Sequence, residues 1–138
     1  MKTSVIDIGL QWETPALTLA LSEAMAQGAA AQVVVNTTGS SGIKKRVVLS
    51  IDAISASAEL SNARVNAMSG DVWSLLLPTN HIAGLNVLAR ALKLGSSAVG
   101  ADQRADHTAI VPTQLHRALF GDRKLLEHLQ NCKTVLVG

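Results

Sequence analysis

Residues 37–45 read Thr-Thr-Gly-Ser-Ser-Gly-Ile-Lys-Lys and stand between two apolar runs, at 32–36 and 46–49. The apolar runs predict two strands, and the segment between them is expected to form a loop. Its glycines, Gly39 and Gly42, can adopt positive φ, which lets main-chain N–H groups converge on an anion. One cation and four hydroxyl groups are available from Lys45, Thr37, Thr38, Ser40 and Ser41. This composition favours polyphosphate binding, and the alternative is a Gly/Ser connector without a ligand.

Two other phosphate motifs do not fit this loop. The P-loop pattern G-x-x-x-x-G-K-[ST] requires a glycine five residues after Gly39, where the chain has Lys44. The dinucleotide pattern G-x-G-x-x-G fails as well, because Ser41 and Lys44 stand at the positions of its later glycines. The loop therefore indicates another class of phosphate site.

Helix and strand patterns alternate along the chain. Thr14 is expected as an N-cap, with Pro15 in the first turn, and Ser50 as the N-cap of a second helix. The expected elements outside the loop's two strands are helices 14–28, 50–65, 82–94, 112–120 and 123–130 and strands 72–77, 98–100, 108–111 and 134–137. This order predicts an α/β fold with a largely parallel or mixed sheet and flanking helices. Ligands of such sheets bind beyond the carboxyl ends of strands, which favours sites at 37–45 and 78–84.

Residues 37–47 resemble the phosphate-binding signature T-S-G-[ST]-T-G-x-P-K-[GA]-V of the adenylate-forming enzymes, the superfamily of acyl-CoA synthetases. Lys44 replaces the usual proline, which removes a fixed φ from the loop, and Arg46 replaces the usual small residue. Residues 75–90, LLLPTNHIAGLNVLAR, are similar to the next signature, L-P-x-x-H-x-x-G, in the form typical of the o-succinylbenzoate:CoA ligases of menaquinone biosynthesis. Later segments of those ligases are similar to residues 111–115 and 134–138, so the resemblance runs in order from residue 32 to the end.

The resemblance implies an ATP-dependent acid:CoA ligase. In this family the loop holds the β- and γ-phosphates of ATP while a substrate carboxylate attacks the α-phosphate, and CoA then displaces AMP from the acyl-adenylate. Phosphate binding is thereby assigned to Thr37, Thr38, Gly39, Ser40, Ser41, Gly42 and Lys45. The resemblance also implies Mg²⁺, with its ligand expected outside this chain.

Three further residues are placed on the acyl side by the resemblance. His81 is the candidate catalytic residue and is expected to shape the acyl pocket and the approach of CoA; the alternative is a helix-start histidine bonded to local backbone. Gly84, from the same signature, is expected on the substrate side. Arg90 is expected to bind the second carboxylate of o-succinylbenzoate, because a guanidinium fork matches a carboxylate. Helical spacing puts it about half a turn away from His81, and a plain exposed helical arginine is the alternative.

The resemblance accounts for only part of such an enzyme. The later Tyr-Gly-x-Thr-Glu segment, the ribose-binding aspartate and the C-terminal domain with its lysine have no counterpart in these 138 residues. Residues 1–138 are therefore expected to form a partial N-terminal AMP-binding domain that is inactive alone. The alternatives are another acyl- or aryl-CoA ligase, a non-catalytic or degenerate nucleotide-binding module, and an interaction domain. A homo-oligomer is left open.

Composition limits the classes of partner that this protein is expected to bind. The net charge of +2, from 12 basic and 10 acidic residues, and the scarcity of aromatic side chains both disfavour nucleic acid. No apolar stretch has the length of a membrane span or the form of a secretory signal, so a cytoplasmic protein without a membrane partner is expected. The four histidines show no metal-ligand spacing, and the single cysteine, Cys132, is interpreted as a core thiol. The expected partners are a small-molecule carboxylate, ATP and CoA.

Overall fold

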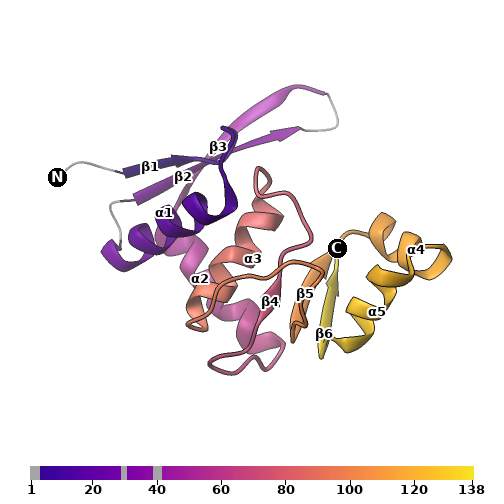
Figure 1. Ribbon diagram of the computed structural model, residues 1–138. Coiled ribbons are helices and arrows are strands. Elements are labelled where there is room, and N and C mark those ends of the chain that lie inside the picture. The colour runs from indigo at the N-terminus through magenta and orange to yellow at the C-terminus, as the bar shows by residue number, and fades with distance from the viewer. Residues whose placement is uncertain (1–3, 29–30, 39–41) are drawn as a thin grey trace.

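The computed structural model describes residues 4–28, 31–38 and 42–138, and the statements below concern this part of the chain (Figure 1). Helices and strands alternate through two small sheets, which confirms the predicted α/β class. In chain order the elements are β1 (Ser4–Asp7), α1 (Thr14–Gln27), β2 (Ala31–Thr38), β3 (Lys44–Ser50), α2 (Ile51–Arg64), β4 (Trp73–Ser74), α3 (Ile82–Lys93), β5 (His107–Ile110), α4 (Pro112–Phe120), α5 (Arg123–Asn131) and β6 (Thr134–Val137).

The first sheet has the strand order β1-β2-β3. β1 runs parallel to β2, with α1 as the crossover, and β2 and β3 form an antiparallel hairpin. Side chains alternate along a strand, so Ile6, Val33 and Val35 share the face that packs against the helices. The helices complete this core with Leu17, Leu21, Ile51, Ile54, Leu85 and Leu88. In Figure 1 the sheet lies along the top of the view, with the helices below it and the hairpin extending past α3.

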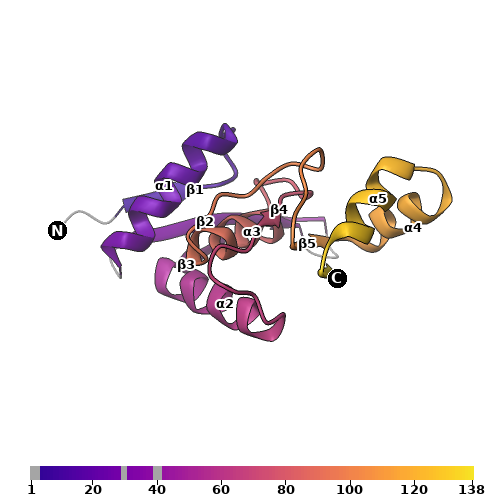
Figure 2. The same ribbon diagram turned by 60° about the horizontal axis from the view of Figure 1, so that its bottom comes forward.

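The second sheet has the order β4-β5-β6 and is parallel throughout. α3 connects β4 to β5 and completes the predicted βαβ unit, and α4 and α5 connect β5 to β6. All four residues of β5 are buried. Figure 2 shows α4 and α5 together at the end of the molecule away from α1.

The strand predicted at 72–77 is much shorter than expected, because only its two β4 residues pair with β5. Beyond β4 the main chain forms hydrogen bonds with partners other than β5. The Leu75 N–H donates to the Val99 carbonyl at 2.8 Å, and the Leu76 carbonyl accepts from Gln114 Nε2 at 2.8 Å. The run 72–77 is apolar because its side chains pack in the hydrophobic core, although its main chain does not continue as a strand.

Other strand boundaries also differ from the sequence prediction. The strand predicted at 98–100 is wrong, since this segment contributes a single bridge between Val99 and Ser74. β1 was not predicted, because it has only two apolar residues between polar ones, Val5 and Ile6, and the strand it pairs with follows only after a whole helix. β3 begins at Lys44, two residues earlier than expected, so its cations belong to a strand rather than to the loop.

Helix starts agree better with the sequence. Ser50 caps α2 as predicted, with its Oγ accepting from the Ala53 N–H at 3.1 Å. α1 begins at the expected place, but Thr14 is already helical and the N-cap is Glu13, which makes no side-chain capping bond. The predicted N-cap role of Thr14 is therefore wrong, although the element itself is confirmed.

Candidate functional site

The predicted phosphate loop is the end of the β2–β3 hairpin. Strand pairing sets Thr37 opposite Lys45 and Asn36 opposite Arg46. By the alternation of side chains, Thr37 and Lys45 lie on the face that packs against the helices, and Arg46 lies on the other face. Both Thr37 and Lys45 are exposed. The hairpin therefore presents a hydroxyl and an ammonium side by side beyond the edge of the core.

The three consecutive cations of β3 have different surroundings. Arg46 Nη1 lies 3.6 Å from Asp7 Oδ2 on β1, which makes it part of a surface ion pair. Lys45 makes no salt bridge with a described residue, so its charge is available to an anion. Lys44 pairs with Thr38 across the strands and shares the outer face with Arg46.

The glycines of the loop are described in part. Gly42 has a φ of 75°, the left-handed region that was expected for a glycine at this turn. Gly39, Ser40 and Ser41 lie outside the described residues. Thr38 is the last residue of β2.

His81 and Gly84 form the start of α3. His81 is the N-cap, its N–H donates to the Pro78 carbonyl at 3.4 Å, and its exposed side chain makes no capping bond. Gly84 is buried, and a Cβ at this position would collide with the Pro78 carbonyl oxygen. The glycine therefore lets the first turn of α3 pack against the chain that precedes it, and this packing sets the position of the exposed imidazole.

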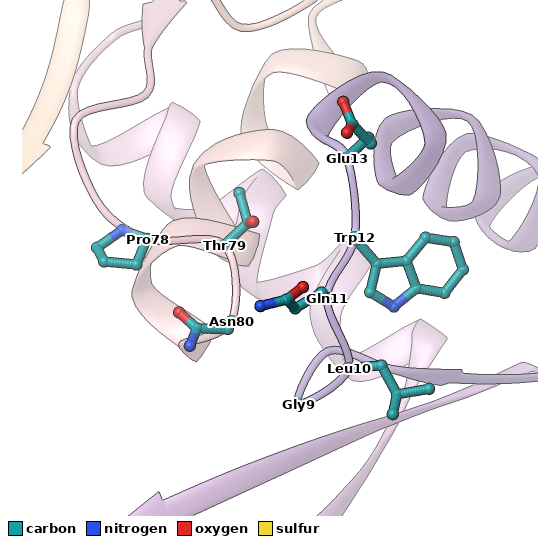
Figure 3. A pocket seen from close by; sticks show the side chains of 8 residues that line it. All are labelled: Gly9, Leu10, Gln11, Trp12, Glu13, Pro78, Thr79 and Asn80. Atoms are coloured by element: carbon teal, nitrogen blue, oxygen red, sulfur yellow. The ribbon is translucent and has the colours of Figure 1, made fainter.

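An open cavity of about 530 Å³ lies beside this turn. It is bounded by the loop that follows β1 and by the turn before α3, through Gly9, Leu10, Gln11, Trp12, Glu13, Pro78, Thr79 and Asn80. In Figure 3 the Gln11 side chain points toward the 78–80 turn and the Trp12 ring points away from it. Trp12 Nε1 donates to the Asp7 carbonyl at 2.8 Å, which fixes the orientation of the ring.

The segment that borders the cavity also contacts the β2–β3 hairpin. Asp7 Oδ1 accepts from the Gly9 N–H at 2.9 Å, while its Oδ2 pairs with Arg46. A Cβ on Gly9 would meet the Asn36 side chain of β2, so the loop passes directly against the hairpin. Neither Lys45 nor His81 lines the cavity itself. The sequence analysis missed Gln11 and its loop, because only the unpredicted strand β1 shows that this loop lies at a carboxyl end.

Arg90 lies apart from His81. They are nine positions apart in sequence, which corresponds to a rise of about 13.5 Å along the axis of α3. The Arg90 guanidinium carbon is 5.0 Å from the centre of the buried Trp73 ring, and burial lowers the pKa of this guanidinium. Its Nε is buried and has no hydrogen-bond partner among the described residues. The structure therefore does not bring His81 and Arg90 together, and places the arginine against an aromatic ring.

Two buried polar pairs near the second sheet were missed by the sequence analysis. His107 Nε2 lies 2.9 Å from Asp71 Oδ2, and His128 Nε2 lies 2.7 Å from Ser74 Oγ. The Met68 N–H and then the His107 hydrogen bond hold the pKa of Asp71 below its usual range. The only sign of these buried pairs in the sequence is a polar residue inside an apolar run, as at Ser74. Cys132, predicted as a core thiol, is half-buried, and burial raises the pKa of its thiol.

Among the described residues, every helix is too short or too polar to cross a bilayer.

Comparison with known proteins gives a consistent set of relatives, although no family model matches the chain. A probable 2-succinylbenzoate–CoA ligase of Mycobacterium tuberculosis is 31% identical over 124 residues, which cover 77% of this chain and 32% of that protein. The 2-succinylbenzoate–CoA ligase of Lactococcus lactis is 27% identical over 119 residues, covering 77% of this chain and 25% of the relative. The chain thus spans about a quarter to a third of the length of these curated relatives.

Solved structures show the same fold. An AMP-forming acyl-CoA synthetase-like protein of Dyadobacter fermentans matches 94% of this chain and 39% of its own, with a TM-score of 0.73 and 24% identity. A variant of Escherichia coli MenE with bound OSB-AMS matches 77% of this chain and 24% of its own, with a TM-score of 0.62 and 27% identity. Sequence and fold together place this chain in the adenylate-forming acyl-CoA synthetase superfamily, where it matches part of the N-terminal domain.

Proposed function

We propose that this chain supplies the ATP-phosphate hairpin and the acyl-side turn of an AMP-forming acid:CoA ligase, and that the acid is 2-succinylbenzoate. The observation that carries the proposal is the cross-strand pair of Thr37 and Lys45 on the helix-facing side of the hairpin. The substrate is suggested by the curated relatives, which are named 2-succinylbenzoate–CoA ligases. We further propose that the chain is part of an N-terminal AMP-binding domain, acts in the cytoplasm and is inactive without the rest of the enzyme.

The exposed charge of the hairpin supports the proposal. The Lys45 ammonium is exposed and unpaired among described residues, and the neighbouring Arg46 is engaged by Asp7. Gly42 adopts a positive φ, a conformation that occurs in turns whose main-chain N–H groups bind anions. Phosphate-binding roles of Thr37, Thr38, Gly39, Ser40, Ser41, Gly42 and Lys45 belong to this proposal. In the reaction Lys45 would balance negative charge on the departing pyrophosphate without forming a covalent bond.

The acid and CoA would be handled on the α3 side. ATP would supply the adenylyl group that activates the carboxylate, and CoA the thiol that accepts the acyl group. His81 stands exposed at the helix start beside the 530 Å³ cavity, and Gly84 fixes that turn. Arg90 would bind the second carboxylate of the acid, away from the reacting one. The described residues contain no group of three or more His, Cys, Asp or Glu that could hold a metal ion. We propose, as the resemblance implies, that the Mg²⁺ ligand lies outside this chain.

Calorimetric titration with ATP and with pyrophosphate tests the hairpin. We expect Lys45→Ala to weaken binding of both by about tenfold, the effect of losing one charge-assisted contact. Lys44→Ala is the matched control, because this neighbouring lysine lies on the opposite face of the hairpin, and its affinity should stay within about twofold. Equal affinities in the wild type and Lys45→Ala would contradict the phosphate role and favour the connector alternative.

The catalytic part of the proposal is tested in a full-length acid:CoA ligase in which these residues form part of the N-terminal domain. Pyrophosphate release should then depend on 2-succinylbenzoate and exceed the rate with benzoate or a fatty acid. Nucleotide binding without acid-dependent pyrophosphate release would instead indicate a non-catalytic nucleotide-binding module. Release that depends on a different acid would identify another acyl- or aryl-CoA ligase.

A further inference from the structure

A single buried amide joins three elements around Arg90. Asn62, on α2, is 6% exposed. Its Oδ1 accepts from Trp73 Nε1 on β4 at 2.9 Å, and its Nδ2 donates to the Arg90 carbonyl on α3 at 3.1 Å. The amide oxygen of Asn62 is therefore hydrogen-bonded to the indole, and its amide nitrogen is hydrogen-bonded to the main chain of the arginine.

The Trp73 ring is fixed on more than one side. It is completely buried, and the His107 ring lies against it with a centroid distance of 5.2 Å. His107 is held in turn by Asp71 at 2.9 Å. With its Nε1 bonded to Asn62, the indole has little freedom to rotate, so it forms a rigid platform in the interior.

Arg90 rests on this platform without a counter-charge. Its guanidinium carbon is 5.0 Å from the ring centre, within the range of a cation–π contact. No described carboxylate forms a salt bridge with it, and its buried Nε has no partner among those residues. A half-buried cation that is stacked but not neutralised is costly to hold and is suited to an incoming anion.

We propose that Asn62 is a positioning residue for the Arg90 guanidinium, which it orients toward a carboxylate of an aromatic dicarboxylic acid by fixing the Trp73 ring and the Arg90 main chain together. This inference rests on the substrate role proposed for Arg90. Asn62 itself does not touch the acid. Its effect passes through the ring on which the cation lies and through the helix backbone that carries it.

The experiment compares acid and nucleotide binding in the same proteins. Titrations with 2-succinylbenzoate and with ATP are made on the wild type, Asn62→Leu, Trp73→Phe and Arg90→Ala, with Asn131→Leu as a control at an exposed position. Asn62→Leu keeps a similar volume and removes both hydrogen bonds. We expect it to weaken acid binding by about tenfold and to leave ATP binding unchanged. The control should bind both ligands as the wild type does.

Trp73→Phe provides a second variant in case Asn62→Leu does not fold. It keeps an aromatic face for the cation and removes the Nε1–H that Asn62 holds, so acid binding should fall by several-fold. If Asn62 acts through this ring, the double variant should bind the acid no more weakly than Asn62→Leu alone. In a Trp12→Phe background the fluorescence of Trp73 should change when the acid binds to the wild type, and less so in Asn62→Leu.

The outcomes separate this inference from the proposed function. If Arg90→Ala no longer binds the acid while folded Asn62→Leu and Trp73→Phe bind it normally, the positioning role of Asn62 is overturned. The substrate role of Arg90 then stands. Unchanged acid binding in Arg90→Ala, or no acid binding by the wild type, overturns both roles. The hairpin proposal is decided separately by ATP binding and its loss in Lys45→Ala.

Discussion

The β2–β3 hairpin and the α3–β4–β5 region carry their polar groups in opposite environments. Six of the seven β3 residues are exposed, including all three cations, whereas every residue of β5 is buried. The exposed side chains of β3 contribute little to packing and are available to a ligand. The polar groups of the second region are enclosed and hydrogen-bonded, as in the Asn62–Trp73 and Asp71–His107 pairs. The difference predicts that truncating a buried side chain of the second region costs more stability than truncating an exposed cation of β3.

Trp73→Ala should have the largest effect. It removes a fully buried indole that contacts Asn62, His107 and Arg90, and we expect a loss of about 4 kcal/mol in the free energy of unfolding. Urea unfolding followed by circular dichroism measures this loss. Trp12→Ala, at a half-buried position, should cost clearly less; an equal cost would remove the contrast between the interior and the periphery.

Gly84→Ala comes next. Its Cβ would collide with the Pro78 carbonyl, so α3 must shift, and we expect a loss of about 2 kcal/mol in unfolding free energy. Gly121→Ala is the matched control, because a Cβ there meets no atom within 4 Å and φ is 171°, an extended value that any residue adopts. Equal melting temperatures for the two variants would show that the turn before α3 yields without cost.

Asp71→Asn should change how stability depends on pH. The folded-state pKa of Asp71 lies below its ordinary value of 3.8, so the carboxylate stabilises the fold above that pH. This contribution is lost as pH falls from about 4 through the folded-state pKa. We therefore expect the variant to be about 1 kcal/mol less stable than the wild type at pH 7, with the gap closing toward pH 2. Urea titrations at several pH values, with exposed Asp102→Asn as control, measure the gap; a gap independent of pH would contradict this role.

Lys45→Ala should have the smallest effect on stability. The side chain is exposed and makes no ion pair with a described residue, so the unfolding free energy should change by less than about 0.5 kcal/mol. The same variant is expected to lose phosphate affinity. A loss of stability comparable to that of Gly84→Ala would mean that the Lys45 side chain contributes to packing.

The sequence predicts local features well because their causes are local. Ser50 is recognisable as an N-cap from its own position before an apolar pattern, and the hairpin is recognisable from glycines between two apolar runs. Gly84 and Arg90 are found by the resemblance, but their contacts with Pro78 and Trp73 depend on how α3 packs. These contacts could not be derived from spacing along the chain.

Features that depend on distant segments were missed or misjudged. β1 is short, and only its pairing with β2 makes it a strand, so the Gln11 loop beside the cavity could not be anticipated. The run 72–77 looked like a long strand because apolar packing and strand pairing leave the same pattern in the sequence. The catalytic assignment of His81 and the phosphate assignments remain predictions.

β3 is one of the two edge strands of its sheet, and in the described part of the chain no further strand pairs with its outer side, where a strand of a second molecule could add. Three adjacent positive charges and two exposed valines lie along this strand. Two copies that approached each other edge to edge would bring like charges together, which disfavours such pairing. An anion bound at the hairpin would weaken that repulsion, and the tendency of the protein to self-associate should then vary with ionic strength and with the supply of polyphosphate.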